Sequence, residues 1–270
     1  MPSVFLDDRG VARVSGEDAR ALLQGLFTCD TDKVAPGHPA FGALLTPQGK
    51  IVVDFLVHET GEGFWLDCPL ALAVDFVKRL RFYKLRARVE IADLSATHGV
   101  AALWGEDGEG EADPRAPGLG RRIIGDRAAL ASAHGRGAEA AYEALRVSTG
   151  VPRGGVDFAY GETFPHEANM DLLHGVDFRK GCYVGQEVVS RVQHRGTARK
   201  RIVRVRYAGP PPAPGTPVLA GEIEIGVTGS VAGGEGLAML RTDRAREALA
   251  AGGTLMAGGT RVLCDLAASP

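Results

Sequence analysis

The residue of this sequence best suited to covalent chemistry is a cysteine flanked by glycines. Cys182 lies in the segment KGCYVGQE, residues 180–187, and follows Arg179 and Lys180. Nearby cations and helix amides favour the thiolate, which is the reactive form of cysteine and the form that binds metals. The pattern predicts a reactive, redox-sensitive thiol or an element of a ligand pocket. The alternative is a small residue packed under a turn.

Polar residues just after Cys182 are candidates for the same site. Gln186 can both donate and accept hydrogen bonds, as recognition of a heterocycle requires. Tyr183, Glu187 and Arg191 lie next to it along the chain. We interpret all four as candidate binding residues. For Glu187 the alternative is a charge that stabilises the start of a helix beginning near residue 185.

An acid inside an apolar segment is the second candidate for chemistry. Asp54 lies in KIVVDFLV, residues 50–57, which has the pattern of a β-strand. A buried carboxylate is costly unless it is paired or faces a cavity. We therefore predict that Asp54 binds an amine or an N–H group of a ligand. The alternative is an acid that reaches water or a neighbouring arginine.

We find no metal-binding motif. His166-Glu167 begins like a zinc-protease motif, but Met170 occupies the position of the second histidine. No two of the four cysteines have the C-x-x-C spacing of zinc ribbons or cluster ligand sets. We expect Glu167 and Asn169 to fix a loop or to line a pocket, and Asn169 is the preferred contact to a ligand.

Two basic runs stand out against a nearly neutral chain. Residues 78–88 and 191–206 contain Lys and Arg but no acid, and the second run has seven such cations. Such runs are usually solvated faces. The alternative is a rim that attracts the carboxylates of a ligand tail, or RNA. Direct nucleic acid binding is disfavoured because aromatic residues, which stack on bases, make up only 6% of the chain.

Hydrophobic periodicity places these residues on an alternation of helices and strands. Helices are predicted over residues 15–27, 69–85 and 138–150, and strands over 40–46 and 50–59, joined by a Pro-Gly turn. In the second helix, one face carries Leu70, Val74, Val77, Leu80 and Leu85. The acidic Gly/Pro-rich segment 105–120 is predicted to be a mobile loop that the core does not need. Short strands after residue 200 predict an antiparallel barrel or sandwich.

Bulk properties restrict the class of protein. The 270 residues are 45% hydrophobic and carry a formal charge of −2, which is typical of a globular protein. The first residues include acids and lack the apolar core of a secretory leader. No run approaches the roughly 20 apolar residues of a membrane helix. We expect a cytoplasmic protein without a membrane partner.

The octapeptide KGCYVGQE resembles the signature of the YgfZ-like folate-binding proteins, which are relatives of the glycine-cleavage T-protein, an aminomethyltransferase. Weaker similarities occur in the same order along the chain, at residues 48–57, 81–91, 145–154 and 165–171. The resemblance implies an α+β fold with a T-protein-like body of two interleaved α/β subdomains, residues 1–198. It also implies a C-terminal antiparallel β-barrel domain, residues 199–270.

The same resemblance implies a function. A pocket for tetrahydrofolate or a derivative would lie in the body, with Asp54 beside a folate nitrogen and Cys182 supplying thiol chemistry. The protein would be a folate-binding accessory factor in iron-sulfur cluster assembly or repair, with cluster client or assembly proteins as partners. It would support tRNA modification enzymes indirectly.

Two other functions remain open. One is a tetrahydrofolate-dependent one-carbon transferase, and the other is a scaffold that keeps the pocket without chemistry. Against the transferase, Ser148 stands where T-proteins have the glutamate expected to hold the pterin. Serine lacks the two-oxygen fork with which a carboxylate binds paired donors.

Overall fold

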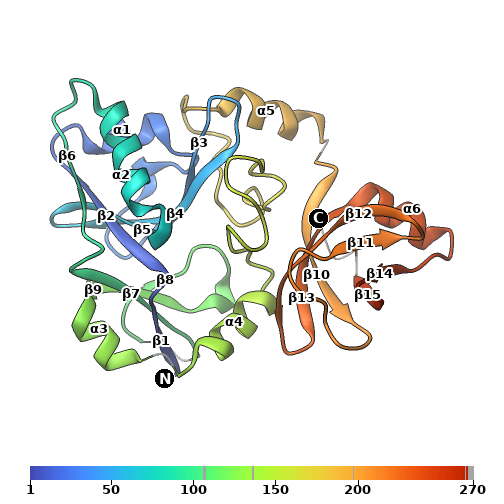
Figure 1. The fold of residues 1–270 in the computed structure, drawn as a ribbon. Coiled ribbons are helices and arrows are strands. Elements are labelled where there is room, and N and C mark those ends of the chain that lie inside the picture. The colour runs from blue at the N-terminus through green and yellow to red at the C-terminus, as the bar shows by residue number, and fades with distance from the viewer. Residues whose placement is uncertain (106–107, 136, 197, 265, 267–270) are drawn as a thin grey trace.

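Two sheets and a barrel make up the fold (Figure 1). The computed structural model describes residues 1–105, 108–135, 137–196, 198–264 and 266. The sheets and their helices form the body, and the barrel packs to one side of it (Figure 1). Within the described residues, no helix is long and apolar enough to cross a membrane.

The first sheet has five antiparallel strands. In spatial order they are β3 (Ala40–Leu45), β4 (Ile51–Thr60), β5 (Gly63–Pro69), β2 (Arg9–Ser15) and β6 (Glu90–Asp93). Helices α1 (Ala19–Leu26) and α2 (Leu70–Lys84) contribute buried residues to a core around the stacked rings of Phe55 and Phe76, whose centroids are 5.2 Å apart. The predicted hairpin is confirmed, because β3 and β4 pair directly.

The second sheet has four strands, and the chain enters it twice. Its spatial order is β1 (Ser3–Leu6), β7 (His98–Leu103), β9 (Arg121–Asp126) and β8 (Glu111–Ala112). The chain leaves this sheet after β1, builds the whole first sheet and returns at β7, so the two subdomains interleave as predicted. Helices α3 (Arg127–His134) and α4 (Glu139–Ser148) follow β9.

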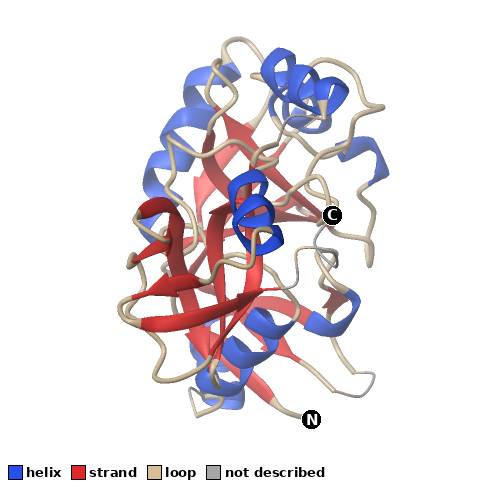
Figure 2. Ribbon diagram, turned by 90° about the vertical axis from the view of Figure 1, so that its right-hand side faces the viewer, coloured by secondary structure: helices blue, strands red, loops and turns tan. Residues whose placement is uncertain are grey.

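The C-terminal region is a closed antiparallel barrel of six strands (Figure 2). Its strands, in barrel order, are β10 (Lys200–Tyr207), β13 (Glu235–Arg241), β12 (Ile223–Ala232), β11 (Pro217–Ala220), β14 (Leu255–Ala257) and β15 (Thr260–Cys264). Helix α6 (Thr242–Ala250) contributes the buried Ala245 to the barrel core. Closure removes open sheet edges, which is how small all-β units avoid aggregation. This settles the choice between barrel and sandwich.

A long irregular segment follows α4 and leads into helix α5 (Gln186–Arg195), which precedes the first strand of the barrel. Gly185 precedes α5 with a φ of +81°, and a Cβ there would lie 2.5 Å from the carbonyl oxygen of Thr46. Glycine is therefore required for this close approach to the turn between β3 and β4. The predicted helix start near residue 185 is confirmed.

Two predictions about packing are wrong. On α2, Val74 and Leu85 are exposed, and the buried face is formed by Ala73, Phe76 and other residues. The helix ends at Lys84, and Leu85 leaves the helical path with a φ of +47°. The described part of segment 105–120 is also needed by the core, because Leu119 is buried there.

Candidate functional site

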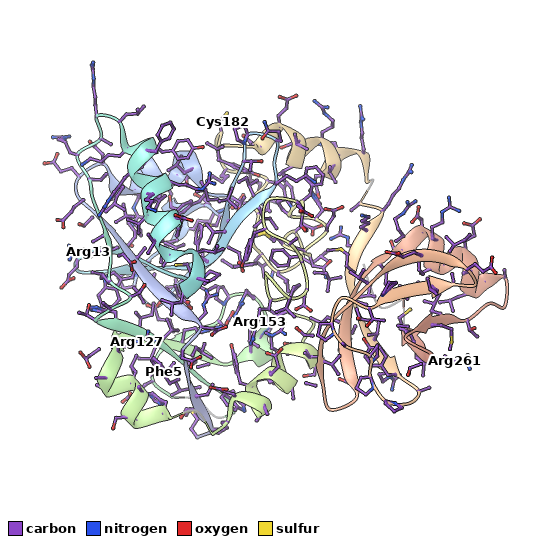
Figure 3. All side chains as sticks on the ribbon, viewed as in Figure 1. Phe5, Arg13, Arg127, Arg153, Cys182 and Arg261 are labelled. Carbon is purple, nitrogen blue, oxygen red and sulfur yellow. The ribbon has the colours of Figure 1, made fainter. Side chains whose placement is uncertain are left out.

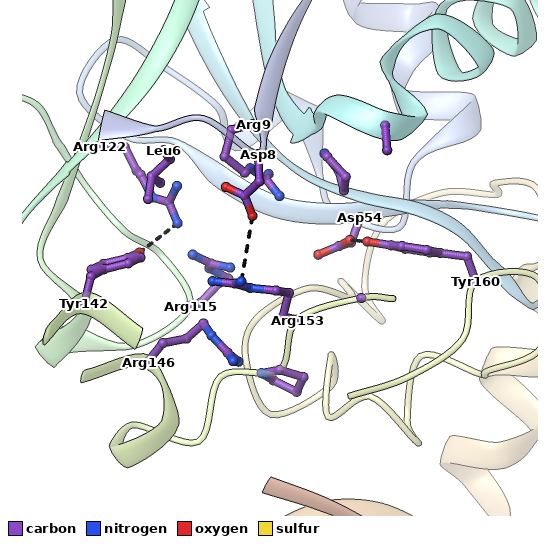
Figure 4. Close-up of a pocket in the computed structure, with 14 residues that line it drawn as sticks. Leu6, Asp8, Arg9, Asp54, Arg115, Arg122, Tyr142, Arg146, Arg153 and Tyr160 are labelled. Carbon is purple, nitrogen blue, oxygen red and sulfur yellow. Dashed lines mark hydrogen bonds and ion pairs between the residues drawn. The ribbon is translucent and has the colours of Figure 1, made fainter. Parts of the chain in front are cut away.

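A cavity of about 210 Å³ lies where the two sheets meet the irregular chain (Figure 4). Its walls are formed by residues of both sheets, of the start of α2, of α4 and of nearby loops. Most of the polar groups in these walls are charged. The charged residues are Asp8, Arg9, Asp54, Arg115, Arg122, Arg146 and Arg153.

Asp54 supplies the only buried carboxylate among the residues that line this cavity. It lies on β4 and is 6% exposed, and its Oδ1 accepts a hydrogen bond of 2.5 Å from the hydroxyl of Tyr160. Burial and the adjacent Asp54 charge raise the pKa of Tyr160 well above its usual value, so the hydroxyl remains a donor. The other oxygen of Asp54 has no hydrogen-bond partner among the described residues and is available to a ligand.

Buried arginine-aspartate pairs form the cavity wall next to the second sheet. Arg9 on β2 contacts Asp67 on β5 through Nε at 2.5 Å, and Nη1 of Arg122 on β9 lies 3.3 Å from the same carboxylate. Arg122 also reaches Asp113, which forms a two-pronged pair with Arg115 at 2.9 and 2.7 Å. The network thus joins the two sheets across the body.

The network holds these carboxylates ionised although they are buried. Burial alone would raise the pKa of Asp67, but the charges of Arg9 and Arg122 outweigh it and lower the pKa below its usual value. Burial opposes ionisation of Asp113 as well, and the Arg115 charge again prevails and lowers the pKa. A carboxylate between two guanidinium groups is stable only in such a paired geometry.

Acid should destabilise the protein through Asp67 and Asp113. Their pKa values lie below the unfolded value of about 3.9, so the unfolded chain takes up protons first as the pH falls. The stabilisation is complete above that value and is lost as the pH falls through the folded pKa. We expect urea midpoints to decline steeply below about pH 4, and to decline less in Asp113→Asn. A midpoint that stays constant down to pH 3 would contradict this mechanism.

A second charged group connects the cavity to the barrel. Arg146 on α4 is 3% exposed and lies 3.1 Å from Asp157, whose Oδ1 accepts from the backbone N–H of Ser230 on β12. Gly229 permits this contact, because a Cβ there would lie 2.2 Å from the Asp157 carboxylate. These contacts therefore join this wall of the cavity directly to the barrel.

Cys182 does not line the cavity, and the prediction that it shares a pocket with Asp54 is wrong. The thiol is exposed on the turn that precedes α5. Figure 3 shows it at the outer edge of the body, well separated from the cavity residue Arg153. The Lys180 ammonium, two positions earlier in the chain, donates to the carbonyls of Phe27 and Cys29 at 2.6 and 2.8 Å.

The candidates beside Cys182 also lie outside the cavity. Tyr183 is 7% exposed and packs in the core between body and barrel. Gln186 is half-buried at the first position of α5, and its backbone N–H donates to Tyr183. Glu187 and Arg191 form an exposed pair at 2.5 Å along one face of α5, the geometry of an ordinary helix surface.

Asn169 lines a separate hollow at the seam between body and barrel. It has a φ of +57°, and its Nδ2 donates to the carbonyl of Ile202 on β10 at 2.6 Å, which fixes the irregular chain. Glu167 fixes the same segment by accepting from the backbone N–H of Phe164. Ser148 lies in the Asn169 hollow rather than in the cavity, and its hydroxyl donates to Leu145.

Most residues of the cavity could not be predicted from the sequence. Tyr160 and the arginines at positions 9, 115, 122, 146 and 153 were not predicted as site residues. Two of these arginines directly follow a proline in loop-like segments. Arg115 lies in ADPRA and Arg153 in GVPRG, and this gives only a weak signal of a fixed position. Within the described chain, no group of three or more His, Cys, Asp or Glu side chains is arranged to hold a metal ion.

Comparison with known proteins places this fold in the aminomethyltransferase class. Residues 8–109 match the family described as the GCVT N-terminal domain, and residues 199–267 match the CAF17 C-terminal beta-barrel domain. The glycine cleavage system aminomethyltransferase T of Bartonella henselae superposes with a TM-score of 0.76 over 97% of this chain and 84% of its own, at 16% identity. The predicted fold class is confirmed.

More similar sequences define the family. The mouse protein named iron-sulfur cluster assembly factor IBA57, mitochondrial, is 32% identical over 88% of this chain and 77% of its own length. The homologue of Mycosarcoma maydis is 35% identical over 76% of this chain. This chain belongs to the IBA57 family. The match spans 57% of the M. maydis protein, so this chain covers little more than half of that relative.

The names of these relatives correct one prediction. The mouse and M. maydis proteins are both named mitochondrial, as is the relative from Phaeosphaeria nodorum. The expectation of a cytoplasmic protein, which depended on the first residues of the sequence, is contradicted by these names.

Proposed function

We propose that the cavity beside Asp54 binds the pterin ring of tetrahydrofolate or a derivative. The observation that supports this most strongly is the Asp54 carboxylate, which is buried, held by Tyr160 and left with one free oxygen at the cavity wall. A carboxylate of this kind makes charge-assisted hydrogen bonds to N–H groups, which reduced pterins carry along their edge. Proteins of the aminomethyltransferase fold class bind folate, and this similarity of fold also supports the proposal.

The size and chemistry of the cavity fit such a ring. Pockets for drug-sized ligands measure about 300–1,000 Å³, so a cavity of about 210 Å³ suits a bicyclic ring with its substituent outside. Tyr160 and Asp54 would orient the ring, and the paired arginines would line the wall beside it. A bound tetrahydrofolate would supply a nitrogen nucleophile that carries one-carbon groups.

We further propose that the protein acts as an accessory factor in iron-sulfur cluster assembly or repair. Its relatives carry this role in their names, and Cys182 is exposed where a partner protein can reach it. Cluster client or assembly proteins would be the partners, and tRNA modification enzymes would benefit indirectly, as in the YgfZ-like branch. Residues 1–198 would form the folate-binding body and 199–270 the barrel domain.

A complementation experiment tests this role. In cells deprived of their own relative, this protein should restore the activity of several cluster-containing enzymes. Cys182→Ala should lose part of the rescue because it removes the accessible thiol. Cys264→Ala, which removes a thiol from barrel strand β15 outside the cavity, is the matched control and should rescue fully. Full rescue by Cys182→Ala would exclude the thiol from the function.

The alternative is a one-carbon transferase. It would consume an aminomethyl donor or formaldehyde together with tetrahydrofolate, and Asp54→Asn would abolish that turnover. Ser148 weighs against this alternative, because T-proteins have a glutamate at this position and the serine hydroxyl bonds only to its own helix. No turnover by the purified protein, combined with rescue in cells, would favour the accessory role. A scaffold without chemistry would tolerate both Asp54→Asn and Cys182→Ala.

A further inference from the structure

The turn that follows α2 holds a leucine in a backbone conformation that favours glycine. The backbone N–H of Ala87 donates to the carbonyl of Lys84 at 2.8 Å, and Leu85 between them has φ and ψ angles of +47° and −110°. These are the angles of the first central position of a type II′ turn, where glycine is preferred because a Cβ is strained. The Leu85 side chain is 87% exposed, so no burial within the protein offsets this strain. Backbone strain of this kind is concentrated at functional sites.

A second apolar side chain stands in water beside this turn. Phe82, on the last turn of α2, is 77% exposed. The chain around it is fixed on both sides, because Arg81 donates to the carbonyl of Ile91 at 3.1 and 2.8 Å and the backbone N–H of Arg88 donates to Asp18 at 2.7 Å. Residues 78–88, which we call the α2 tip, lie at the outer edge of the body, away from the barrel (Figure 1). The two exposed side chains are therefore presented on a rigid support.

The α2 tip also carries positive charge that the protein does not neutralise. It contains six Lys and Arg residues and no acid. Three of the six have partners, since Lys78 contacts Asp75, and Arg81 and Arg88 make the bonds described above. Within the described chain, the side chains of the other three have neither a hydrogen bond nor an ion pair; these are Arg79, Lys84 and Arg86. The acids that flank the tip in space are already paired: Glu17 and Asp18 with Arg88, and Glu90 with Arg13.

This positive charge does not serve the Asp54 cavity. Neither residues 78–88 nor residues 191–206, the two basic runs of the sequence, line that cavity. The prediction that one of them forms an anion-attracting rim around the ligand tail is therefore wrong for this cavity. The charge of the α2 tip needs an anionic partner outside the protein.

The composition of the α2 tip indicates which anionic partner it fits. The segment KRLRFYKLRAR contains only basic, aliphatic and aromatic residues, with no Ser, Thr, Asn or Gln. Interfaces between proteins use directional hydrogen bonds, which neutral polar side chains help to supply. The surface of an anionic bilayer needs only cations for its headgroups and a few aromatic or aliphatic side chains that enter the boundary of the acyl chains. Basic amphipathic helices are typical of such contacts.

We propose that the α2 tip docks on the surface of an anionic lipid bilayer. Phe82 and Leu85 enter the interface between headgroups and acyl chains, and Arg79, Lys84 and Arg86 contact the lipid phosphates. The contact needs no membrane-spanning helix, and it revises the expectation of a protein without a membrane partner. It is independent of the proposed pterin binding.

Sedimentation with lipid vesicles tests the proposal. The probes are vesicles of phosphatidylcholine with about 30% phosphatidylglycerol and vesicles of phosphatidylcholine alone. We expect binding to the anionic vesicles to be stronger by roughly tenfold or more, since each cation near an anionic surface contributes about fivefold in affinity. Lys84→Gln and Arg86→Gln should each reduce this preference. Added salt should weaken binding, because it screens the charges.

Leu85→Gly separates docking from folding. It removes the exposed side chain and places at the turn the residue that the turn favours. We expect affinity for anionic vesicles to fall by about fivefold or more, as loss of a partly buried apolar side chain requires, while the melting temperature stays at or above that of the wild-type protein. Phe82→Ser should reduce binding similarly. Ile223→Ser, which removes a 61% exposed side chain from barrel strand β12, is the matched control and should bind like the wild type.

Each contrary result has its own meaning. Failure of the wild-type protein to bind either kind of vesicle would overturn the proposal and would point instead to an acidic protein as the partner of the α2 tip. Equal binding to both kinds of vesicle would overturn the role of the cations. Anionic-vesicle binding that Leu85→Gly and Phe82→Ser leave as strong as in Ile223→Ser would place the contact elsewhere on the molecule. A melting temperature well below that of the wild type in Leu85→Gly would assign the leucine to folding.

Discussion

Replacing Asp67 by alanine should lower the free energy of unfolding by about 3–5 kcal/mol, the typical cost of removing one partner from a buried ion pair. Asp67 is fully buried and is the carboxylate that Arg9 and Arg122 share. Its loss leaves two buried guanidinium groups with less countercharge at the junction of the two sheets. Urea unfolding measures the effect. The slope of the unfolding free energy against urea concentration should be the same for the variant and the wild-type protein.

A surface pair provides the matched control. Arg241 and Asp243 form a two-pronged arginine-aspartate pair, at 3.0 and 2.7 Å, but both side chains are partly exposed. Water already solvates such groups, so Asp243→Ala should change stability little. If Asp67→Ala fails to fold, Asp67→Asn removes the charge and keeps the shape. Equal losses for the buried and the exposed pair would refute the structural role of the network.

Asp54→Asn should weaken binding of a reduced pterin by roughly tenfold or more, since hydrogen bonds to charged groups contribute about 1.5–3 kcal/mol. The amide keeps the size of the side chain but loses the charge and one acceptor. Titration calorimetry of the variant with 6-methyltetrahydropterin measures the change. This ligand has no glutamyl tail, so the comparison reports only on contacts to the ring.

Tyr160→Phe separates direct contact from positioning. It removes the hydroxyl that donates to Asp54 at 2.5 Å and leaves the carboxylate in place. We expect a smaller loss of affinity than in Asp54→Asn, because the aspartate loses only the group that orients it. Unchanged pterin affinity in Asp54→Asn would remove this carboxylate from the ligand site.

Local patterns were enough to predict much of the fold. The β3–β4 hairpin follows from two apolar runs around a Pro-Gly turn, and the start of α5 follows from Gly185. The apolar periodicity of α2 predicted that Val74 and Leu85 are buried, but both are exposed. Periodicity indicates which residues share a face of a helix, but not how far the packing partner extends along that face. The resemblance supplied the interleaving of the sheets, which no local signal carries.

The site was predictable only in part, for a similar reason. Asp54 could be predicted because a carboxylate in an apolar strand is costly to bury unless it is paired or faces a cavity. It does line the cavity. The arginine network could not be found, since Arg9 and Asp67 are 58 positions apart and each is unremarkable in its own segment. Segment 105–120 looked like solvated loop by composition, yet Arg115 is buried against Asp113. The resemblance grouped Cys182 with the Asp54 pocket although the two residues are distant in the sequence, and the fold places Cys182 outside it.

Thermal unfolding with tetrahydrofolate or its formyl and methyl forms, under anaerobic conditions, is the most direct test of the pterin cavity. A ligand that binds only the native protein stabilises it by RT ln(1 + [L]/Kd), about 2.7 kcal/mol at a hundredfold excess over Kd. We expect a saturable rise in Tm for the wild-type protein, and a much smaller one for Asp54→Asn at the same ligand concentration. No rise at millimolar ligand would contradict the central claim that this cavity binds a reduced pterin.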